Sequence, residues 1–382
     1  MATRSNIFDK IIFDSFQLTP ESLGLYRILY ALFLLIFGVP NFTWISRFPD
    51  VFYNPPLLSL HTFFSGFPSY WFLLLVSLGT CISTVLLLFG YKTRLTSILL
   101  ALFIFTGKSF AYSFGKIDHD FLIWIIPLVM SFSNWGAAYS LDAKLKHQDR
   151  VVQNWPVVLL ALILSFAMFS AGLPKLLGGW LDISTHAVRG HFLREFYVNE
   201  RQDLLAPFFL NLNSALVWEF FDYAGVFLEV FFIFAIIRPN LFRFFVICAI
   251  FFHVFNYLML NIAFSINIIL YLLFVDWGMI ISKLRKHRML LSIERAINFR
   301  SLLIVGLLYT SFYLIYITAT ESVTFNVSPL RFVLEDLMNL DSLIFSGIVI
   351  FLGLIVAVLN LIHFVSKKKD FSDSTIPKYM HN

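Results

Sequence analysis

One lysine occupies a position where this sequence could hold a reactive amine. Lys175 lies near the end of a long apolar run and follows a turn of small residues, Ser170 to Gly172, which allows close helix approach. A lysine held in apolar surroundings loses hydration, and this favours its neutral form. A neutral amine can act as a general base near neutral pH. The alternative is a lysine whose ammonium snorkels to the lipid headgroups.

Two histidines are further candidates. His119 opens another apolar run between Asp118 and Asp120, and the flanking carboxylates could orient its ring and favour its protonated form. The alternative is a plain helix start capped by Asp118. His253 and Asn256 are three residues apart and therefore share a helix face, where a polar pair is often a contact between helices.

Glu229 is the costliest of the ionisable residues, because it lies in the middle of an apolar run. Arg27 is a partner of the right sign but of a different depth. We expect no metal, because His186 and His191 are five residues apart and no Glu-x-x-His motif occurs. Phosphate-loop, nucleophile-elbow and nucleic-acid motifs are absent from the sequence as well.

The composition says what must position these residues. Of the 382 residues, 59% are hydrophobic and only 13% are charged. A soluble domain carries about 25% charged residues, so lipid has to solvate much of this chain. Cys81 and Cys248 both lie in apolar runs and do not suggest a disulfide. The sequence predicts an all-α, polytopic transmembrane bundle.

Apolar runs of about 20 residues mark the expected spans. We predict about ten of them: Glu21–Phe42, Ser69–Gly90, Thr96–Tyr112, His119–Trp135, Val157–Leu177, Trp218–Ile237, Phe242–Leu260, Ala263–Ile281, Ser301–Thr320 and Ser342–Val365.

Basic residues alternate between the loops in a way that predicts the orientation. One set of loops carries most of them, including Lys92, Arg94, Lys144, Arg238 and the cluster from Lys283 to Arg288. The positive-inside rule places that set, with both termini, in the cytoplasm of a multi-pass cell-membrane protein. Lys175, His119, His253 and Asn256 then fall in the outer half of three different spans, and this convergence favours a shared site.

Three regions follow from the pattern. Residues 1–18 interleave apolar and charged residues and predict an interfacial amphipathic helix. Residues 19–281 form the main transmembrane domain, and residues 282–382 add two further spans and a cytoplasmic tail. The outer segment 174–217 mixes charges with aromatic residues, which predicts a second surface helix.

The ordered motifs resemble a known family. They are Leu23 to Ile28, Gly90 to Arg94, Asp118 to Asp120, Ala138 to Asp142, Ala171-Gly172-x-x-Lys175-Leu176 followed by Trp180, and Phe252-His253-x-x-Asn256. Their order and spacing over about residues 20 to 280 are similar to those of the HTTM family, the transmembrane domain of vitamin K-dependent γ-carboxylases and their bacterial homologues.

This resemblance implies a chemistry. In the family a lysine deprotonates a reduced quinone, oxygen reacts with it, and the resulting base removes a proton from an acceptor that then captures carbon dioxide. It implies that Lys175 is the base, that His119 assists, and that His253, Asn256 and Trp180 bind the cofactor. The cofactor would be vitamin K hydroquinone or menaquinol, with O2 and CO2 as co-substrates.

The same resemblance leaves two classes of function. The first is an integral membrane enzyme, a lyase or quinol monooxygenase acting on an unknown peptide or small-molecule acceptor on the non-cytoplasmic side. The second is a non-catalytic quinone or lipid carrier, or a scaffold. The sequence offers no counterpart of the external substrate domain of the carboxylases, and Pro174 stands where the animal enzymes have a second lysine. Membrane lipid is an expected partner in both cases, and nucleic acid in neither.

Overall fold

The computed structural model of the chain describes residues 15–16, 18–57, 59–115, 119–145, 151–284, 288–319 and 325–374. Within these ranges, the side chains of residues 60, 119, 284, 288–291 and 366–374 are not described. The interfacial helix predicted for residues 1–18 lies almost entirely outside the described residues.

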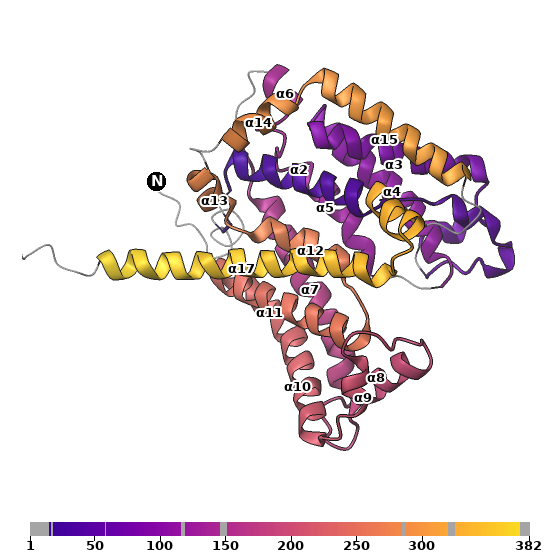
Figure 1. Ribbon diagram of the computed structural model, residues 1–382, viewed down its shortest axis with the longest axis vertical. Coiled ribbons are helices and arrows are strands. Elements are labelled where there is room, and N and C mark those ends of the chain that lie inside the picture. The colour runs from indigo at the N-terminus through magenta and orange to yellow at the C-terminus, as the bar shows by residue number, and fades with distance from the viewer. Residues whose placement is uncertain are drawn as a thin grey trace, which may run out of the picture. The chain divides into compact units, whose positions relative to one another are not determined.

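The prediction of an all-α polytopic membrane protein is confirmed (Figure 1). Among the residues that the structure describes, eight helices are long and apolar enough to cross a membrane. They are α2 (Pro20–Phe37), α3 (Tyr70–Phe89), α4 (Thr93–Tyr112), α7 (Trp155–Leu177), α10 (Ala215–Phe231) with its continuation η6 (Phe232–Ile237), α11 (Pro239–Leu260), α15 (Phe299–Ala319) and α17 (Ser342–Ser374).

Two of the ten predicted spans differ from this set. The predicted span His119–Trp135 contains only η5 (His119–Phe121) and α5 (Leu122–Met130), and nine α-helical residues extend about 14 Å, less than a regular spanning helix. The predicted span Ala263–Ile281 is a pair bent by 69°, formed by α12 (Ser265–Tyr271) with η7 (Leu272–Phe274) and by α13 (Trp277–Leu284). Asp276 occupies the break and accepts a hydrogen bond from the Met279 amide, so it caps the second half.

The connections contain short elements. They are β1 (Val39–Pro40), η2 (Thr43–Arg47), η3 (Asp50–Phe52), η4 (Leu60–Phe63), α6 (Leu141–Leu145), α8 (Ala187–Tyr197), α9 (Ala206–Leu210), α14 (Arg288–Ala296), β2 (Asn326–Val327), α16 (Pro329–Arg331) and η8 (Phe332–Leu337). Strands β1 and β2 pair antiparallel, with Val39 opposite Val327.

The chain divides into two compact units, which we describe separately. Among the described residues, unit 1 comprises 15–16, 158–279 and 346–374, and unit 2 comprises 18–157 and 280–345. Helices α2, α3, α4, α5 and α15 form the centre of unit 2, where α3 contacts α2, α4 and α15.

A buried arginine fixes one end of unit 2. Arg27 is fully buried in α2 and donates hydrogen bonds to the carbonyls of Leu87, Leu88 and Tyr139, so it satisfies carbonyls at the end of α3. Gly90 follows α3 at φ +64°, where a Cβ would meet the Arg27 guanidinium within 3 Å. Residues of two motifs from the sequence therefore have a structural role here.

Asp142 completes the same arrangement. Its carboxylate accepts the backbone amides of Lys92 and Thr93 at 2.8 and 2.7 Å, which caps the start of α4. The segment after α5 is thereby tied to the turn between α3 and α4.

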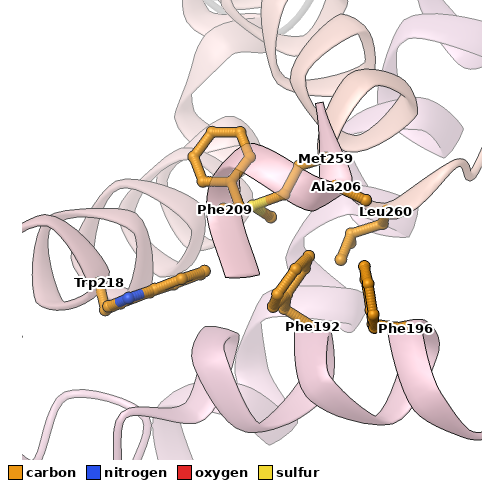
Figure 2. Close-up of a cluster of buried hydrophobic side chains, with 7 residues drawn as sticks. All are labelled: Phe192, Phe196, Ala206, Phe209, Trp218, Met259 and Leu260. Atoms are coloured by element: carbon orange, nitrogen blue, oxygen red, sulfur yellow. The ribbon is translucent and has the colours of Figure 1, made fainter. Parts of the chain in front are cut away.

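One end of unit 1 is a small folded cap. Helices α8 and α9 come from the segment 174–217 and bury a largely aromatic cluster against the ends of α10 and α11 (Figure 2). The cluster consists of Phe192, Phe196, Ala206, Phe209, Trp218, Met259 and Leu260. The apolar face of α8 thus packs on protein.

The C-terminal helix joins unit 1 through polar contacts. His363 of α17 is buried, its Nδ1 lies 2.8 Å from an Asp276 oxygen, and its Nε2 lies 3.3 Å from Arg243 Nη1. Arg243 also donates to the Phe274 carbonyl at 3.0 Å. The break between α12 and α13 is therefore held by α11 and α17 together.

Candidate functional site: a lysine–glutamate pair at the end of α7

Lys175 lies in the last turn of α7, one residue after Pro174. Beyond it the backbone reverses, with the Gly178 amide on the Pro174 carbonyl and the Trp180 amide on the Lys175 carbonyl. This turn brings the Trp180 indole under the ammonium, with Nζ 5.1 Å from the ring centroid. A cation over a Trp face is attracted by the ring quadrupole. The structure therefore places two of the predicted site residues in contact.

The ammonium of Lys175 is paired with Glu229 of α10. Nζ lies 2.6 and 2.7 Å from the two carboxylate oxygens, close enough for hydrogen bonds to both. The lysine side chain is 27% exposed and the glutamate side chain 6%. Arg27, which had the right sign to pair with Glu229, instead serves the end of α3 in unit 2.

The pair depends on a close approach of α7 and α10. A Cβ on Gly172 would lie 2.7 Å from the Glu229 Cβ and 2.9 Å from the Val230 amide nitrogen. Because glycine has no side chain, the two backbones can meet one turn before Lys175. The small-residue turn noted in the sequence thus positions the carboxylate that the sequence could not assign to a partner.

The two groups of this pair are close enough for a proton to pass between them. Burial penalises the charged form of each group, while their mutual attraction offsets that penalty. Transfer of one proton from Nζ to the carboxylate converts an ion pair into a neutral amine and a neutral acid. The amine is then free to accept a proton from a third molecule, and its exposed part leaves room for one.

Glu229 is one of three buried carboxylates on the same face of α10. Glu219 and Asp222 precede it in α10, and their side chains lie beside the first residues of α8. Asp222 accepts the Val188 amide at 2.7 Å, which caps α8. His186 Nδ1 lies 2.8 Å from a Glu219 oxygen, although the two are not aligned for a hydrogen bond.

His191 of α8 lies in the electrostatic field of this region. Burial lowers its pKa from the ordinary value, and the positive charges of Arg194 and Lys175 act in the same direction against the opposing effect of Glu195.

His253 and Asn256 are buried in the same unit. His253 Nε2 lies 2.9 Å from the Tyr271 hydroxyl and 3.2 Å from Asn267 Nδ2. The imidazole is also parallel to the Tyr271 ring. These contacts tie His253 to α12.

The HTTM domain family matches residues 17–279 of the chain. The chain belongs to the HTTM family. The match confirms the predicted family and supports a relationship to membrane proteins of the γ-carboxylase type. No curated protein and no solved structure shows a significant match.

The remaining predicted residue of the HTTM domain, His119, opens η5 in unit 2, and its side chain lies outside the described residues, as does Asp118. Its neighbour Asp120 is described. It forms an ion pair with Lys108 and accepts a hydrogen bond from the Tyr112 hydroxyl at 2.6 Å. That carboxylate is therefore held by α4.

Metal ligation is not supported in the part of the HTTM protein that the structure describes, where no group of three or more His, Cys, Asp or Glu could hold an ion. Sequence reasoning missed the Glu219 and Asp222 contacts. The signal was present, since carboxylates at positions 219, 222 and 229 recur on one face of an apolar helix.

Proposed function

We propose that this HTTM protein is an integral membrane enzyme that activates a membrane quinol, with Lys175 as the general base. The observation that supports it most is the Lys175–Glu229 pair, a partly exposed amine whose proton has a buried acceptor at 2.6 Å. Intramembrane ionisable pairs are expensive and usually functional.

Glu229 has a defined part in this proposal. A bound hydroxyl can lose its proton to Lys175 only after the ammonium has given one up, and the carboxylate is in place to receive it. The balance is simple: the proton passes from Nζ to Glu229, and the hydroxyl proton then passes to Nζ. The more buried glutamate acts as the proton store and the more exposed lysine as the base.

The cofactor would be a reduced quinone, either vitamin K hydroquinone or menaquinol, whose reaction with O2 supplies the strong base of the family chemistry. Trp180 offers a ring face beside Lys175, and His253 and Asn256 offer buried polar groups in the same unit. We propose His119 as the assisting residue on the strength of the family resemblance alone.

The acceptor would be deprotonated and would capture CO2 on the non-cytoplasmic side, which makes the enzyme a lyase of the γ-carboxylase type. The asymmetry of loop charge supports cytoplasmic termini in the cell membrane. Its apolar helices suggest direct contact with membrane lipid.

A non-catalytic quinone or lipid carrier is the second candidate. The observation that favours it is the closed geometry of the pair, because a lysine that satisfies both oxygens of Glu229 also serves as a structural link between α7 and α10. In that case the pair holds the helices together and performs no proton transfer.

Oxygen uptake by the purified full-length protein in lipid nanodiscs separates the two. Reduced menaquinone or vitamin K hydroquinone is added with bicarbonate, and wild type is compared with Lys175→Ala and with Lys283→Ala, an exposed lysine of α13. The enzyme proposal expects quinol-dependent oxygen uptake and an epoxide product in wild type and Lys283→Ala, and a loss of about 100-fold or more in Lys175→Ala.

Two results would contradict it. Full activity in folded Lys175→Ala would remove the lysine from the chemistry. Saturable quinol binding without turnover in every variant would establish the carrier. Folding of each variant is checked by size-exclusion chromatography before the assay.

A further inference from the structure

A cavity of about 690 Å³ lies in unit 2, and its lining includes none of the residues assigned above. It opens between the loop that connects α2 to α3 and the facing ends of α3 and α4. Cavities of 300–1,000 Å³ are typical of small-molecule sites. The residues that line it come from three segments, 50–69, Phe72 and Phe105–Phe110, so the loop and both helices must be folded to form it.

Its walls are aromatic and already packed. The His61 ring meets the Phe110 ring edge-on, with centroids 4.1 Å apart, and the Phe64 and Phe72 rings pack on Phe110 as well. Phe67 and Phe105 are further lining residues. Edge-to-face ring contacts favour fixed orientations, so these rings hold the wall in one arrangement.

The loop is held rigidly in place. Asp50 accepts the Phe67 amide at 2.8 Å, and the Tyr53 hydroxyl donates to the His61 carbonyl at 2.7 Å. A Cβ on Gly66 would lie only 2.4 Å from an Asp50 oxygen, so the chain passes directly over the carboxylate. A preformed cavity of this kind costs little ordering on binding.

The polar groups of the lining restrict the charge of an occupant. They are the Asp50 carboxylate, the His61 imidazole and the hydroxyls of Ser65, Ser69 and Thr106, with no lysine or arginine among the lining residues. Burial lowers the pKa of His61, which keeps its ring neutral. An anionic headgroup would meet a carboxylate and no cation, so the lining disfavours it.

The exposed part of the lining includes two aromatic rings. Phe64 and Phe72 are 56% and 43% exposed, beside the exposed polar residues Asp50, Ser65 and Ser69. Large exposed rings at an opening suit entry from lipid better than entry from water. The occupant should therefore partition into the membrane.

We propose that this cavity binds a small, neutral, lipid-soluble molecule whose aromatic ring carries a hydroxyl group. The ring lies against the phenylalanine walls, and the hydroxyl donates to the oxygen and imidazole acceptors of the lining. This inference concerns unit 2 alone and does not depend on the role of Lys175.

Isothermal titration of the full-length protein in nanodiscs tests the proposal, with empty nanodiscs as the reference for partitioning. The probes share one ring system and differ in the polar group: 1-naphthol, 1-methoxynaphthalene, 1-naphthalenesulfonate and 1-naphthylmethylamine. We expect saturable binding of 1-naphthol, about tenfold tighter than that of the methyl ether, because the ether cannot donate. The sulfonate should not bind.

Variants locate the site. Thr106→Phe fills the cavity from α4 and should abolish naphthol binding, and His61→Phe keeps a ring against Phe110 but removes the imidazole and should weaken binding about tenfold. Leu75→Ala removes an exposed side chain of α3 that does not line the cavity and should bind like wild type. Thermal melting checks that each variant is folded. If Thr106→Phe does not fold, the result for His61→Phe decides whether the cavity is the binding site.

The overturning results are distinct. Equal binding of naphthol and its ether would mean that no polar group is recognised. Tighter binding of the amine would make the site a cation site built on Asp50. Naphthol binding that survives both His61→Phe and Thr106→Phe would place the binding site outside this cavity. The absence of saturable binding would refute the proposal.

Discussion

Replacing Lys175 alone should cost more stability than replacing both members of the Lys175–Glu229 pair. Lys175→Met leaves a carboxylate that is only 6% exposed without its cation, and Glu229→Gln leaves an ammonium that is 27% exposed and can still reach water. Removing one partner of a buried pair costs about 3–5 kcal/mol, and less where the remaining charge is hydrated. We therefore expect losses of about 3 kcal/mol for Lys175→Met and about 2 kcal/mol for Glu229→Gln.

The double variant should lose only about 2 kcal/mol, because a neutral amide beside a thioether leaves no uncompensated charge. The coupling energy is then about 3 kcal/mol, at the upper end for residues in contact. The assay is reversible unfolding in lipid bicelles, with the four proteins compared at one pH. Additive losses, within about 0.5 kcal/mol, would refute the claim that the two charges stabilise each other. A larger loss for Glu229→Gln than for Lys175→Met would refute the assignment of the glutamate as the more buried partner.

Three further predictions follow from other contacts. Arg27→Lys should lower stability by about 2–4 kcal/mol, since an ammonium cannot span the carbonyls that the guanidinium joins; thermal melting checks this, and an unchanged midpoint would contradict it. Asp222→Ala should destabilise α8 by about 1–2 kcal/mol and speed its proteolysis, whereas Asp222→Asn should retain most of the cap. Equal rates of proteolysis in wild type and both variants would argue against capping. The pKa of His61 is lowered in the folded protein, so the unfolded state binds more protons around the ordinary value of 6.5, and stability should fall as the pH drops through that range. His61→Phe should therefore flatten the pH dependence of the melting temperature. An identical slope in both proteins would exclude His61 as the source of that dependence.

The sequence allowed the spans to be predicted because hydropathy is a local property. The start of α2 is an example, with Thr19 accepting the Ser22 amide and Pro20 in the first helical position. The weak fourth span shows the limit. The predicted span was drawn through Trp135, but the α-helix ends at Met130, just before the polar residues Ser131, Ser133 and Asn134.

The partner of Glu229 could not be predicted for a different reason. Lys175 and Glu229 are 54 residues apart, and their contact depends on how far each helix is rotated about its axis. Hydropathy fixes which residues are in a span, whereas rotation follows from packing details such as the approach at Gly172. The cavity beside His61 was missed as well, because loop geometry created it from residues that carry no sequence motif.

The contacts of α17 have a consequence for biosynthesis. Unit 1 is discontinuous, since residues 158–279 are completed by residues 346–374 after an intervening segment of unit 2. Arg243 and Asp276 therefore enter the membrane well before His363 leaves the ribosome, and Gly353, which approaches Ile268, arrives equally late. In a nascent chain, Arg243 and Asp276 should lack their contacts with His363 until the last helix inserts. Premature termination before α17 would then yield a protein that the cell's quality control recognises and degrades, even though the entire HTTM domain had been made.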